Sequence, residues 1–449
     1  MKRILLFITA IFSYQQSYTQ DFNDVRVYIE DLKSKAIRDT SLMSDQGLNI
    51  FMAKKVNTYL TGSGDLSMNK NYFIIDPTDG RLFLGHNWAK DPSQDTFRTK
   101  WIFTTGIKSN VAEAFSTIYS GKDKKLSNNT GLALKLTLLG RGIIYFGENG
   151  TQIQTKELKK FGLTDTTMDR YQQQEIANYY REQLKNEIND LIIIDSTKFE
   201  NKIENTGTEA FRALKRKEFY SKKAKFYKKM FIEEESRYIE EEEIYNAFWN
   251  HWVSLDIYIP ITRQQYRVAE SFTALIEDRM LYNFEGTLIW SNIYERKKMR
   301  LLASIGLGTK IMNNITTAEL EKYSIGSYKQ LGGTDTLSLA QIKTDEIYIG
   351  NYNQFFIPLL KFNLVNFFLA NKQIGLSLLA EKHFGAYNPL NIKAGIPFNL
   401  KGKDDDTKVS FELQFKWNDI NNNILPDVNP SDKFMIGLSV GIPLTSQLY

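Results

Sequence analysis

The chain has 449 residues, of which 42% are hydrophobic and 24% are charged, and its formal net charge is +5 at pH 7. That net charge is too small to predict binding to nucleic acid. Because the sequence contains no cysteine, it excludes disulfide bonds and a lipid anchor attached through cysteine.

Residues 1–19 have the pattern of a secretory signal peptide. Lys2 and Arg3 precede an apolar run at residues 4–12 that is too short to span a membrane as a helix. We expect cleavage near Thr19, and an uncleaved anchor is the alternative. No later run of about eighteen apolar residues occurs, so the sequence predicts an exported protein without transmembrane helices.

Residues 20–70 are expected to form a lead-in that includes an amphipathic helix at residues 23–38, where apolar residues recur at helical spacing. Residues 71–150 are predicted to hold the first strands of a large sheet. Within them, residues 72–88 predict a hairpin around a turn that contains proline and glycine.

Two further strands are predicted before residue 150, at residues 99–108 and at the alternating leucines of residues 132–138. Between them, Asn110 and Glu113 have the spacing of a capping box, and Gly121 lies one short helix further along. This pattern predicts a helix over residues 110–121.

The apolar spacing changes from two to between three and four at residues 156–245, which predicts an inserted antiparallel helical hairpin with its turn at residues 195–207. Its second helix carries a basic run followed by glutamates. This charge pattern has two explanations. The residues form a solvated helix face, or, more specifically, they form a docking site for an anionic partner. The candidate partner-binding residues are Arg212, Lys215, Arg216, Lys222, Lys225 and Lys229.

Residues 251–449 return to alternation of apolar and polar residues, most regularly at residues 408–418 and 434–444. Successive side chains of a strand face opposite sides, so each segment predicts a strand with one apolar face. With the earlier strands, the total is about twelve, within a range of 10 to 14. The remaining predicted strands lie at residues 253–261, 281–294, 299–312, 338–350, 355–369, 373–384 and 391–400.

Long alternating strands, aromatic residues near their ends and a signal peptide together favour a transmembrane barrel over a soluble sandwich, which also alternates. In these features, and in its final residue Tyr449, the sequence resembles Gram-negative outer-membrane β-barrel proteins. The resemblance is to the class and includes no motif of one family. It implies a mainly β fold, an antiparallel transmembrane barrel with an inserted helical hairpin, in contact with outer-membrane lipid.

Residues for catalysis or metal binding are not evident. The three histidines form no metal-spaced pair, and no serine follows His86 at the spacing that a lipid hydrolase would need. Residues 419–430 begin like a calcium loop but have Ile424 where glycine is needed. We therefore expect no enzyme activity, cofactor or metal, although a lipid hydrolase remains a third alternative.

The polar faces of the predicted strands would line the lumen, which either conducts or is sealed by pairing of these groups. The lumen-lining candidates are Lys408, Glu412, Gln414, Lys416, Glu381 and His383. The first functional hypothesis is porin-like passage or gating of small solutes, with the helical hairpin occluding the barrel or binding a partner. The second is a non-conducting barrel that displays the hairpin as an adhesion or assembly module.

The side of the membrane that carries the hairpin follows from the strand count. Counting back from a periplasmic C-terminus through the predicted strands places the insertion on the extracellular side, where it would meet anionic lipopolysaccharide. One missed strand between residues 262 and 350 reverses this result and directs the hairpin toward an envelope protein in the periplasm.

Overall fold

The computed structural model describes most of the chain beyond residue 50. It divides the chain into two compact units, a strand-rich unit and a helical unit, and we describe each by itself. The described residues are 51–52, 55–56, 69–76, 81–89, 101–112, 115–116, 119–120, 125–126, 130–140, 142–145, 170–241, 247–296, 298–315, 320–331, 338–369, 372–385, 387–402, 407–423, 429 and 433–444. The predicted signal peptide and the helix at residues 23–38 lie outside them.

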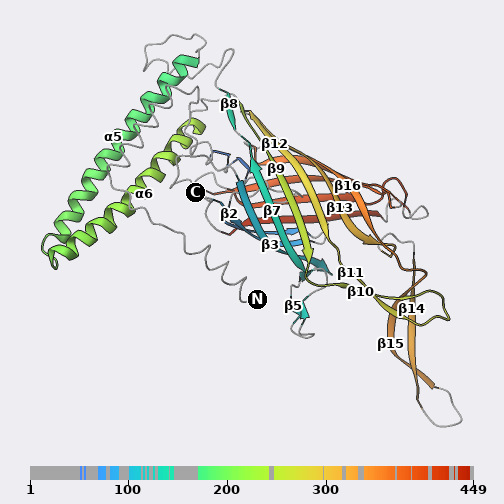
Figure 1. The fold of residues 1–449 in the computed structure, drawn as a ribbon. Coiled ribbons are helices and arrows are strands. Elements are labelled where there is room, and N and C mark those ends of the chain that lie inside the picture. Colours follow the sequence, from blue (N-terminus) through green and yellow to red (C-terminus); the bar gives the residue numbers. More distant parts are fainter. Residues whose placement is uncertain are drawn as a thin grey trace. The chain divides into compact units, whose positions relative to one another are not determined.

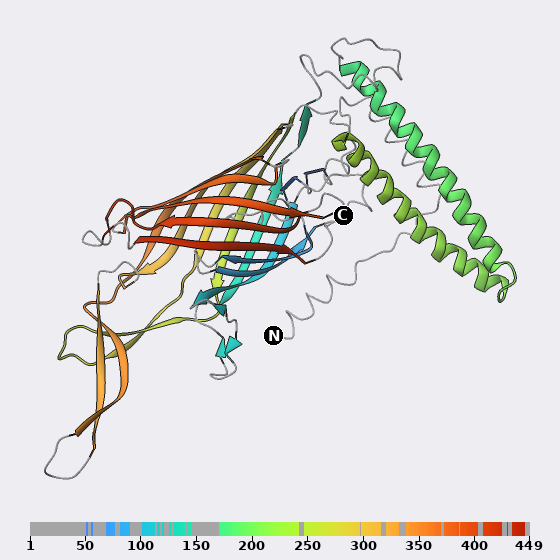
Figure 2. The same cartoon turned by 180° about the vertical axis from the view of Figure 1, so that it is seen from behind.

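The strand-rich unit is a closed antiparallel barrel of twelve strands, which confirms the predicted fold class. The ring closes because β1 pairs with β20, and β9 pairs with β12. Figure 1 shows one wall, and Figure 2 shows the red C-terminal strands beside the blue first strands. The barrel strands are β1 (Asn71–Asp76), β2 (Arg81–Trp88), β3 (Trp101–Ala112), β7 (Gly131–Leu139), β9 (Ala247–Pro260), β12 (Glu285–Arg296), β13 (Met299–Asn313), β16 (Gln354–Leu369), β17 (Ile374–His383), β18 (Leu390–Lys401), β19 (Thr407–Trp417) and β20 (Phe434–Pro443).

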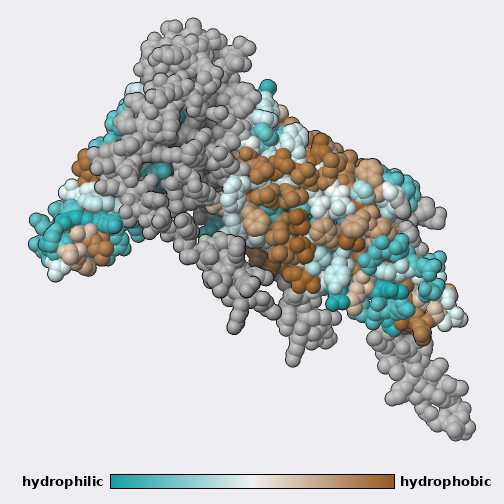
Figure 3. All heavy atoms as spheres, viewed as in Figure 1, coloured by the Kyte–Doolittle hydropathy of each residue, from teal (hydrophilic) through white to brown (hydrophobic). Residues whose placement is uncertain are grey.

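Alternation along these strands sorts side chains between the outer surface and the lumen. On β12, the inward Ser291 and Ile293 are buried, whereas Leu288 is 52% exposed on the outer surface. Apolar side chains cover the outer face of the barrel strands seen in Figure 3. Exposed apolar residues of the barrel strands include Leu138, Leu288, Leu307, Leu376 and Ile436.

The two ends of the barrel differ in the length of their connections. Three tight connections, 297–298, 370–373 and 402–406, lie at one end, which we call the short-turn end, and a fourth, 77–80, lies at the opposite end. β1 begins and β20 finishes at this same end, because Tyr72 pairs with Pro443. Most of the long connections lie at the opposite end, the long-connection end.

The helical insertion leaves the barrel after β7 and returns at β9, at the short-turn end. Our strand count placed it at the end opposite the C-terminus, and this prediction was wrong. The reason is the predicted strand 338–350, which does not enter the barrel: β15 (Ser338–Ile349) pairs with β14 (Glu321–Leu331). Without it, an even number of barrel strands separates the insertion from the C-terminus.

β14 and β15 belong to a second, four-stranded sheet with β10 (Gln264–Ala269) and β11 (Glu277–Leu281). Its core contains Tyr266, Val268 and Leu281, which pack with Ile315 near the end of β13. Both long connections, β9–β12 and β13–β16, therefore form structure beyond the barrel strands at the long-connection end.

A helix was predicted at residues 110–121, but the residues of this segment that the structure describes, 110–112, 115–116 and 119–120, form strands. β3 continues to Ala112 and turns back into β4 (Phe115–Ser116), and β5 (Tyr119–Ser120) pairs with β6 (Lys125–Leu126). The capping box is a local signal, and pairing of β3 with both β2 and β7 overrides it here. A further short strand, β8 (Ile143–Tyr145), pairs with the start of β9.

The helical unit contains α5 (Arg170–Ile203) and α6 (Glu209–Glu241), joined by a short turn. The hairpin is antiparallel, as predicted, but its turn is narrower, because α5 continues through residues 195–203. Facing residues recur every three or four positions, which buries one stripe of each helix. The buried apolar residues include Leu184, Ile188, Ile192, Ala224, Tyr227 and Phe231.

Candidate functional site

The lumen contains a segment from outside the barrel strands. Residues 51, 52, 55 and 56, here called the lumen segment, are helical and no more than 2% exposed. Phe51 lies edge-on to Phe248, with ring centroids 5.2 Å apart, and Asn250 Nδ2 lies 2.7 Å from Met52 Sδ. Because Phe248 and Asn250 begin β9, the lumen segment occupies the lumen near the short-turn end.

Lys55 anchors the lumen segment to the barrel wall by charge. Its Nζ lies 3.0 Å from Glu295 Oε1, and both side chains are almost fully buried. Glu295 also pairs with Arg300 and, at 2.8 Å, with Lys372. Three cations thus share one buried carboxylate, which we call the Glu295 cluster.

A second polar group joins strands on different sides of the β1–β20 seam. Lys393 Nζ lies 3.3 Å from Asp76 Oδ2, and Gln414 Nε2 donates to Glu412 at 2.9 Å. Ser377 donates to the other Glu412 oxygen. Asp76, Glu412 and Gln414 are no more than 1% exposed, so these groups satisfy one another inside the wall of the lumen.

The third group lies toward the long-connection end. Glu285 pairs with Lys361 at 2.6 Å and with Lys108 at 4.0 Å, while Glu381 pairs with Lys310 at 3.4 Å. Lys361 also lies 3.6 Å from Glu381 and so links the two carboxylates. This network holds three lysines and two glutamates.

Four of the six predicted lumen-lining residues fall into the second and third groups. Glu412 and Gln414 belong to the second group, and Glu381 belongs to the third, where His383 Nε2 lies 2.5 Å from Glu381 Oε1. Lys416 is half-buried near the end of β19, and the side chain of Lys408 lies outside the described residues.

The sequence alone did not identify Lys55, Glu295, Arg300 and Lys372 as a cluster. Lys55 stands in no alternating segment, and Lys372 lies in the short connection after β16. Glu295 and Arg300 flank the β12–β13 turn, where charged residues are usual at a solvated hairpin. The one signal in the sequence was the carboxylate of Glu295 at an inward position of an alternating strand. That signal does not say which residues Glu295 pairs with.

The basic residues of the hairpin are engaged mainly within the hairpin. Arg216 pairs with Glu200 at 2.9 Å, Lys215 with Glu218 at 3.0 Å, and Lys229 with Glu233 at 3.5 Å. Of the six predicted partner-binding residues, Lys222 is exposed and Lys225 is half-buried, and the described contacts include no ion pair of either. Of the predicted partner-binding residues, these two lysines are therefore the ones that the described ion pairs of the hairpin do not engage.

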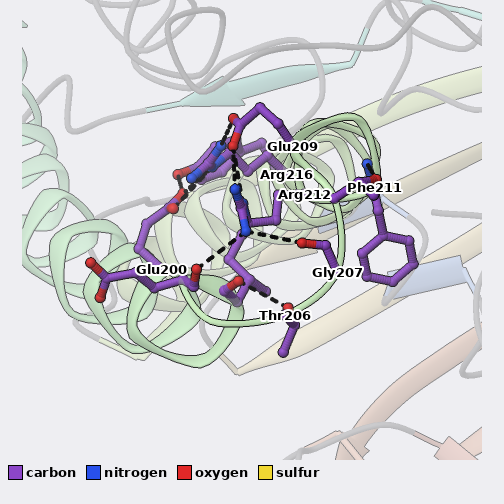
Figure 4. A network of polar contacts seen from close by, with 11 residues as sticks. Glu200, Thr206, Gly207, Glu209, Phe211, Arg212 and Arg216 are labelled. Atoms are coloured by element: carbon purple, nitrogen blue, oxygen red, sulfur yellow. Dashed lines mark hydrogen bonds and ion pairs between the residues drawn. The ribbon is translucent and has the colours of Figure 1, made fainter.

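Arg212 fixes the turn between the two helices, as Figure 4 shows. Its guanidinium pairs with Glu209 at 2.7 Å and donates to the carbonyl oxygens of Gly207 at 3.1 Å and Glu204 at 3.4 Å. Gly207 adopts a φ of 60°, which permits the tight turn. Arg212 therefore holds the turn by occupying carbonyls that the end of α5 leaves unsatisfied.

Sites for other chemistry are not supported in the part of the chain that the structure describes. His86 Nδ1 contacts Asn71 Oδ1 at 2.5 Å, and Asp419, the first residue of the calcium-like loop, pairs with Lys433 at 3.1 Å. Among the described residues, no group of three or more His, Asp and Glu side chains is arranged to hold a metal ion.

Comparisons with known proteins assign no family: no protein-family model matches the chain, and no significant match occurs among curated proteins. In the described residues, no helix combines the length and the apolar character needed to cross a membrane.

Proposed function

We propose that this protein is an outer-membrane β-barrel that passes small solutes through a gated lumen, and that the lumen segment is the gate. The observation that carries the proposal is the buried ion pair between Lys55 and Glu295. It joins a segment that precedes the barrel to the barrel wall, at a position where the segment fills the lumen.

The composition of the Glu295 cluster supports a gate that can open. Arg300 and Lys372 also contact Glu295, so the carboxylate keeps two cationic partners when Lys55 leaves. Departure of Lys55 also relieves repulsion among three neighbouring cations. Removing one partner from a buried ion pair normally costs free energy, because the other charge stays buried without a counter-charge. Glu295 does not incur this cost when Lys55 leaves, because Arg300 and Lys372 remain beside it.

The proposal also includes the localisation of the protein in the outer membrane and the orientation of the barrel in that membrane. Bacterial outer-membrane barrels have short periplasmic turns and long extracellular loops. The short-turn end, the gate and the attachment of the helical hairpin then lie on the periplasmic side. An envelope protein becomes the favoured partner of the hairpin, in place of lipopolysaccharide.

A second candidate function is a non-conducting barrel that displays the hairpin for assembly. The polar groups beyond the gate favour it, because ion pairs such as Lys393–Asp76 connect side chains that are at most 4% exposed. Permanent pairing of this kind would seal the lumen even after the lumen segment leaves.

Conductance in planar bilayers separates the two candidates. The purified full chain is expected to open rarely, and Lys55→Ala is expected to open often, because the gate loses its ion pair. Lys222→Ala, which removes an exposed lysine of α6, is the matched control and should behave like wild type. A Lys55→Ala barrel that is folded, as judged by its gel shift on boiling, and that never conducts would favour the non-conducting barrel.

The proposed orientation is tested by labelling Lys222→Cys in a chain that has no native thiol. On whole cells a membrane-impermeant thiol reagent should not label this variant, and labelling should appear once the outer membrane is opened. Labelling of intact cells would place the hairpin outside. Recovery of the protein in the soluble periplasmic fraction would overturn the proposed localisation in the outer membrane.

A further inference from the structure

The lumen contains a cavity of about 140 Å³ between the third polar group and the β1–β2 wall. Its lining comes from β1, β2, β3, β7, β9, β12 and β16, so it belongs to the barrel interior. A cavity of about 150 Å³ accommodates one benzene molecule. The cavity therefore has room for one ring-sized molecule.

One wall of the cavity is aromatic and is supported by glycines. The rings of Tyr72 and Phe83 lie 5.5 Å apart and both line the cavity. Gly85 and Gly106, which pair across β2 and β3, lie directly behind them. A Cβ at either glycine would come within 2.6 Å of the Phe83 ring, so only glycine lets this ring lie flat along the wall. The wall thus offers a flat apolar surface to a ring.

Cationic side chains exceed anionic ones in the lining. Lys108, Lys135 and Lys361 line the cavity with Asp256 and Glu285 as the acidic residues. Lys135 pairs with Asp256 at 3.5 Å and Lys361 with Glu285 at 2.6 Å. Lys108 is 4.0 Å from Glu285, the longest of these pairs, and its Nζ lies 4.9 Å from the centre of the Tyr258 ring. Among the described lining residues three cations face two anions, and one bound anion would balance these five charges.

Two buried polar atoms of the lining have no hydrogen-bond partner among the described residues. Thr287, only 3% exposed, leaves its Oγ1 unpaired, and Asp256 leaves Oδ1 unpaired. Buried polar atoms of this kind are normally satisfied. A carboxylate oxygen needs a donor, so Asp256 favours a ligand that carries a hydroxyl group, while the Thr287 hydroxyl can donate or accept.

We infer that the cavity binds a ring-sized organic monoanion, an aromatic hydroxy acid, held by its carboxylate near Lys108 and Lys361 and by its hydroxyl group at Asp256. This inference rests on the proposed function in that the ligand would be a solute on its way through the lumen. Binding itself requires only the cavity.

The test is equilibrium dialysis of 4-hydroxybenzoate against the purified full chain in detergent. We expect saturable binding of one molecule per chain. The neutral analogue 4-hydroxybenzamide should bind at least tenfold more weakly because it lacks the charge, and benzoate should bind severalfold more weakly because it lacks the hydroxyl group. No saturable binding to the folded barrel, or equal binding of the amide, would overturn the inference.

Variants locate the site. Lys108→Met should weaken binding of 4-hydroxybenzoate at least tenfold and reduce the preference over the amide. Thr287→Val keeps the shape of the side chain and should weaken binding severalfold, which covers the case that Lys108→Met does not fold. Lys215→Met on α6 is the matched control and should bind like wild type. Unchanged affinity in both folded cavity variants would also overturn the inference.

The outcomes for the cavity and for the gate are distinguishable. If Lys55→Ala conducts but 4-hydroxybenzoate does not bind, the cavity inference fails and gated passage stands. If 4-hydroxybenzoate binds with the expected preferences and no variant conducts, the cavity inference stands and gated passage fails.

Discussion

The barrel lumen and the helical hairpin use charge in different ways. In the lumen, Lys55 and Glu295 are 2% and 0% exposed, and they come from segments far apart in the sequence. In the hairpin, Lys215 and Glu218 are three residues apart on one helix and are 44% and 67% exposed. The same two residue types therefore form a buried long-range pair in one unit and a solvated local pair in the other.

This difference determines what each pair can contribute. An exposed pair gains about 0 to 1 kcal/mol, since water screens it and the side chains lose freedom. A buried pair adds little net stability when intact, yet removal of one partner costs about 3 to 5 kcal/mol because the other charge remains buried. The lumen pairs therefore hold the barrel in one arrangement, except that Glu295 keeps Arg300 and Lys372 when Lys55 leaves, which is the property that a gate needs.

The largest effect is expected at Glu295. Glu295→Ala leaves Lys55, Arg300 and Lys372 together without their shared carboxylate. We expect the free energy of unfolding to fall by about 3 to 5 kcal/mol, because three cations remain in a buried site. Urea unfolding in lipid vesicles, followed by the gel shift of the folded barrel, measures this change.

Glu295→Gln is the companion variant, since it keeps the size of the side chain and removes its charge. It should lose nearly as much stability as Glu295→Ala. A Gln variant as stable as wild type would mean that packing, and not charge, holds this part of the lumen.

Among the described side chains of the hairpin, the ion pair between Arg181 and Glu235 is buried, and it should behave like the lumen pairs. Arg181 Nε donates to Glu235 Oε1 at 2.6 Å, with exposures of 4% and 2%. Arg181→Met leaves the Glu235 carboxylate buried, so we expect the hairpin to lose about 3 kcal/mol of local stability. Hydrogen exchange of α5 and α6 peptides in the full chain measures it. A loss below 1 kcal/mol would show that burial does not decide the behaviour of these pairs.

The alternation of the strands made the barrel predictable from the sequence. The pleat imposes a period of two, so residues such as Glu412 and Gln414 could be assigned to the lumen face without a structure. The period does not say which sheet a strand joins. β15 was therefore counted in the barrel, although it pairs with β14 and β10 in the second sheet, and this one strand reversed the predicted side of the hairpin.

The residues that fill the lumen were not predictable in this way. Lys55 stands in a helical segment, and its contact with Glu295 depends on the closed ring bringing distant segments together. The unpaired Thr287 hydroxyl depends on how neighbouring strands pack. The ion pair of Lys215 with Glu218 is the opposite case, since helical spacing alone predicts it.

A smaller, pH-dependent effect is expected at Asp195. Hydrogen bonds from Lys223 and Tyr227 lower the pKa of its carboxyl below the ordinary value of 3.8. A lowered pKa stabilises the folded hairpin above pH 3.8, and this contribution disappears as the pH falls through the folded-state pKa. The helical circular-dichroism signal of the full chain should melt at a lower temperature at pH 3 than at pH 7.

Asp195→Asn removes the titrating group and should reduce this difference between the two pH values. Because Glu200 and Glu209 also have lowered pKa values, through Tyr220 and Arg212 respectively, part of the difference should remain. A pH dependence that Asp195→Asn leaves unchanged would show that the interactions of Asp195 with Lys223 and Tyr227 do not contribute to it.

The smallest effect is expected for the exposed pair of Lys215 and Glu218. Lys215→Ala should change the local stability of α6 by less than about 1 kcal/mol, because both side chains are exposed and lysine precedes glutamate, the weaker order of charges along a helix. Alanine also favours the helix slightly more than lysine does, which offsets part of the lost attraction. Hydrogen exchange of α6 in Lys215→Ala, Glu218→Ala and the double variant isolates the pair, and the coupling should be below about 0.5 kcal/mol. A coupling as large as the loss expected at Arg181 would remove the distinction between the two kinds of ion pair, because exposure would then no longer separate them.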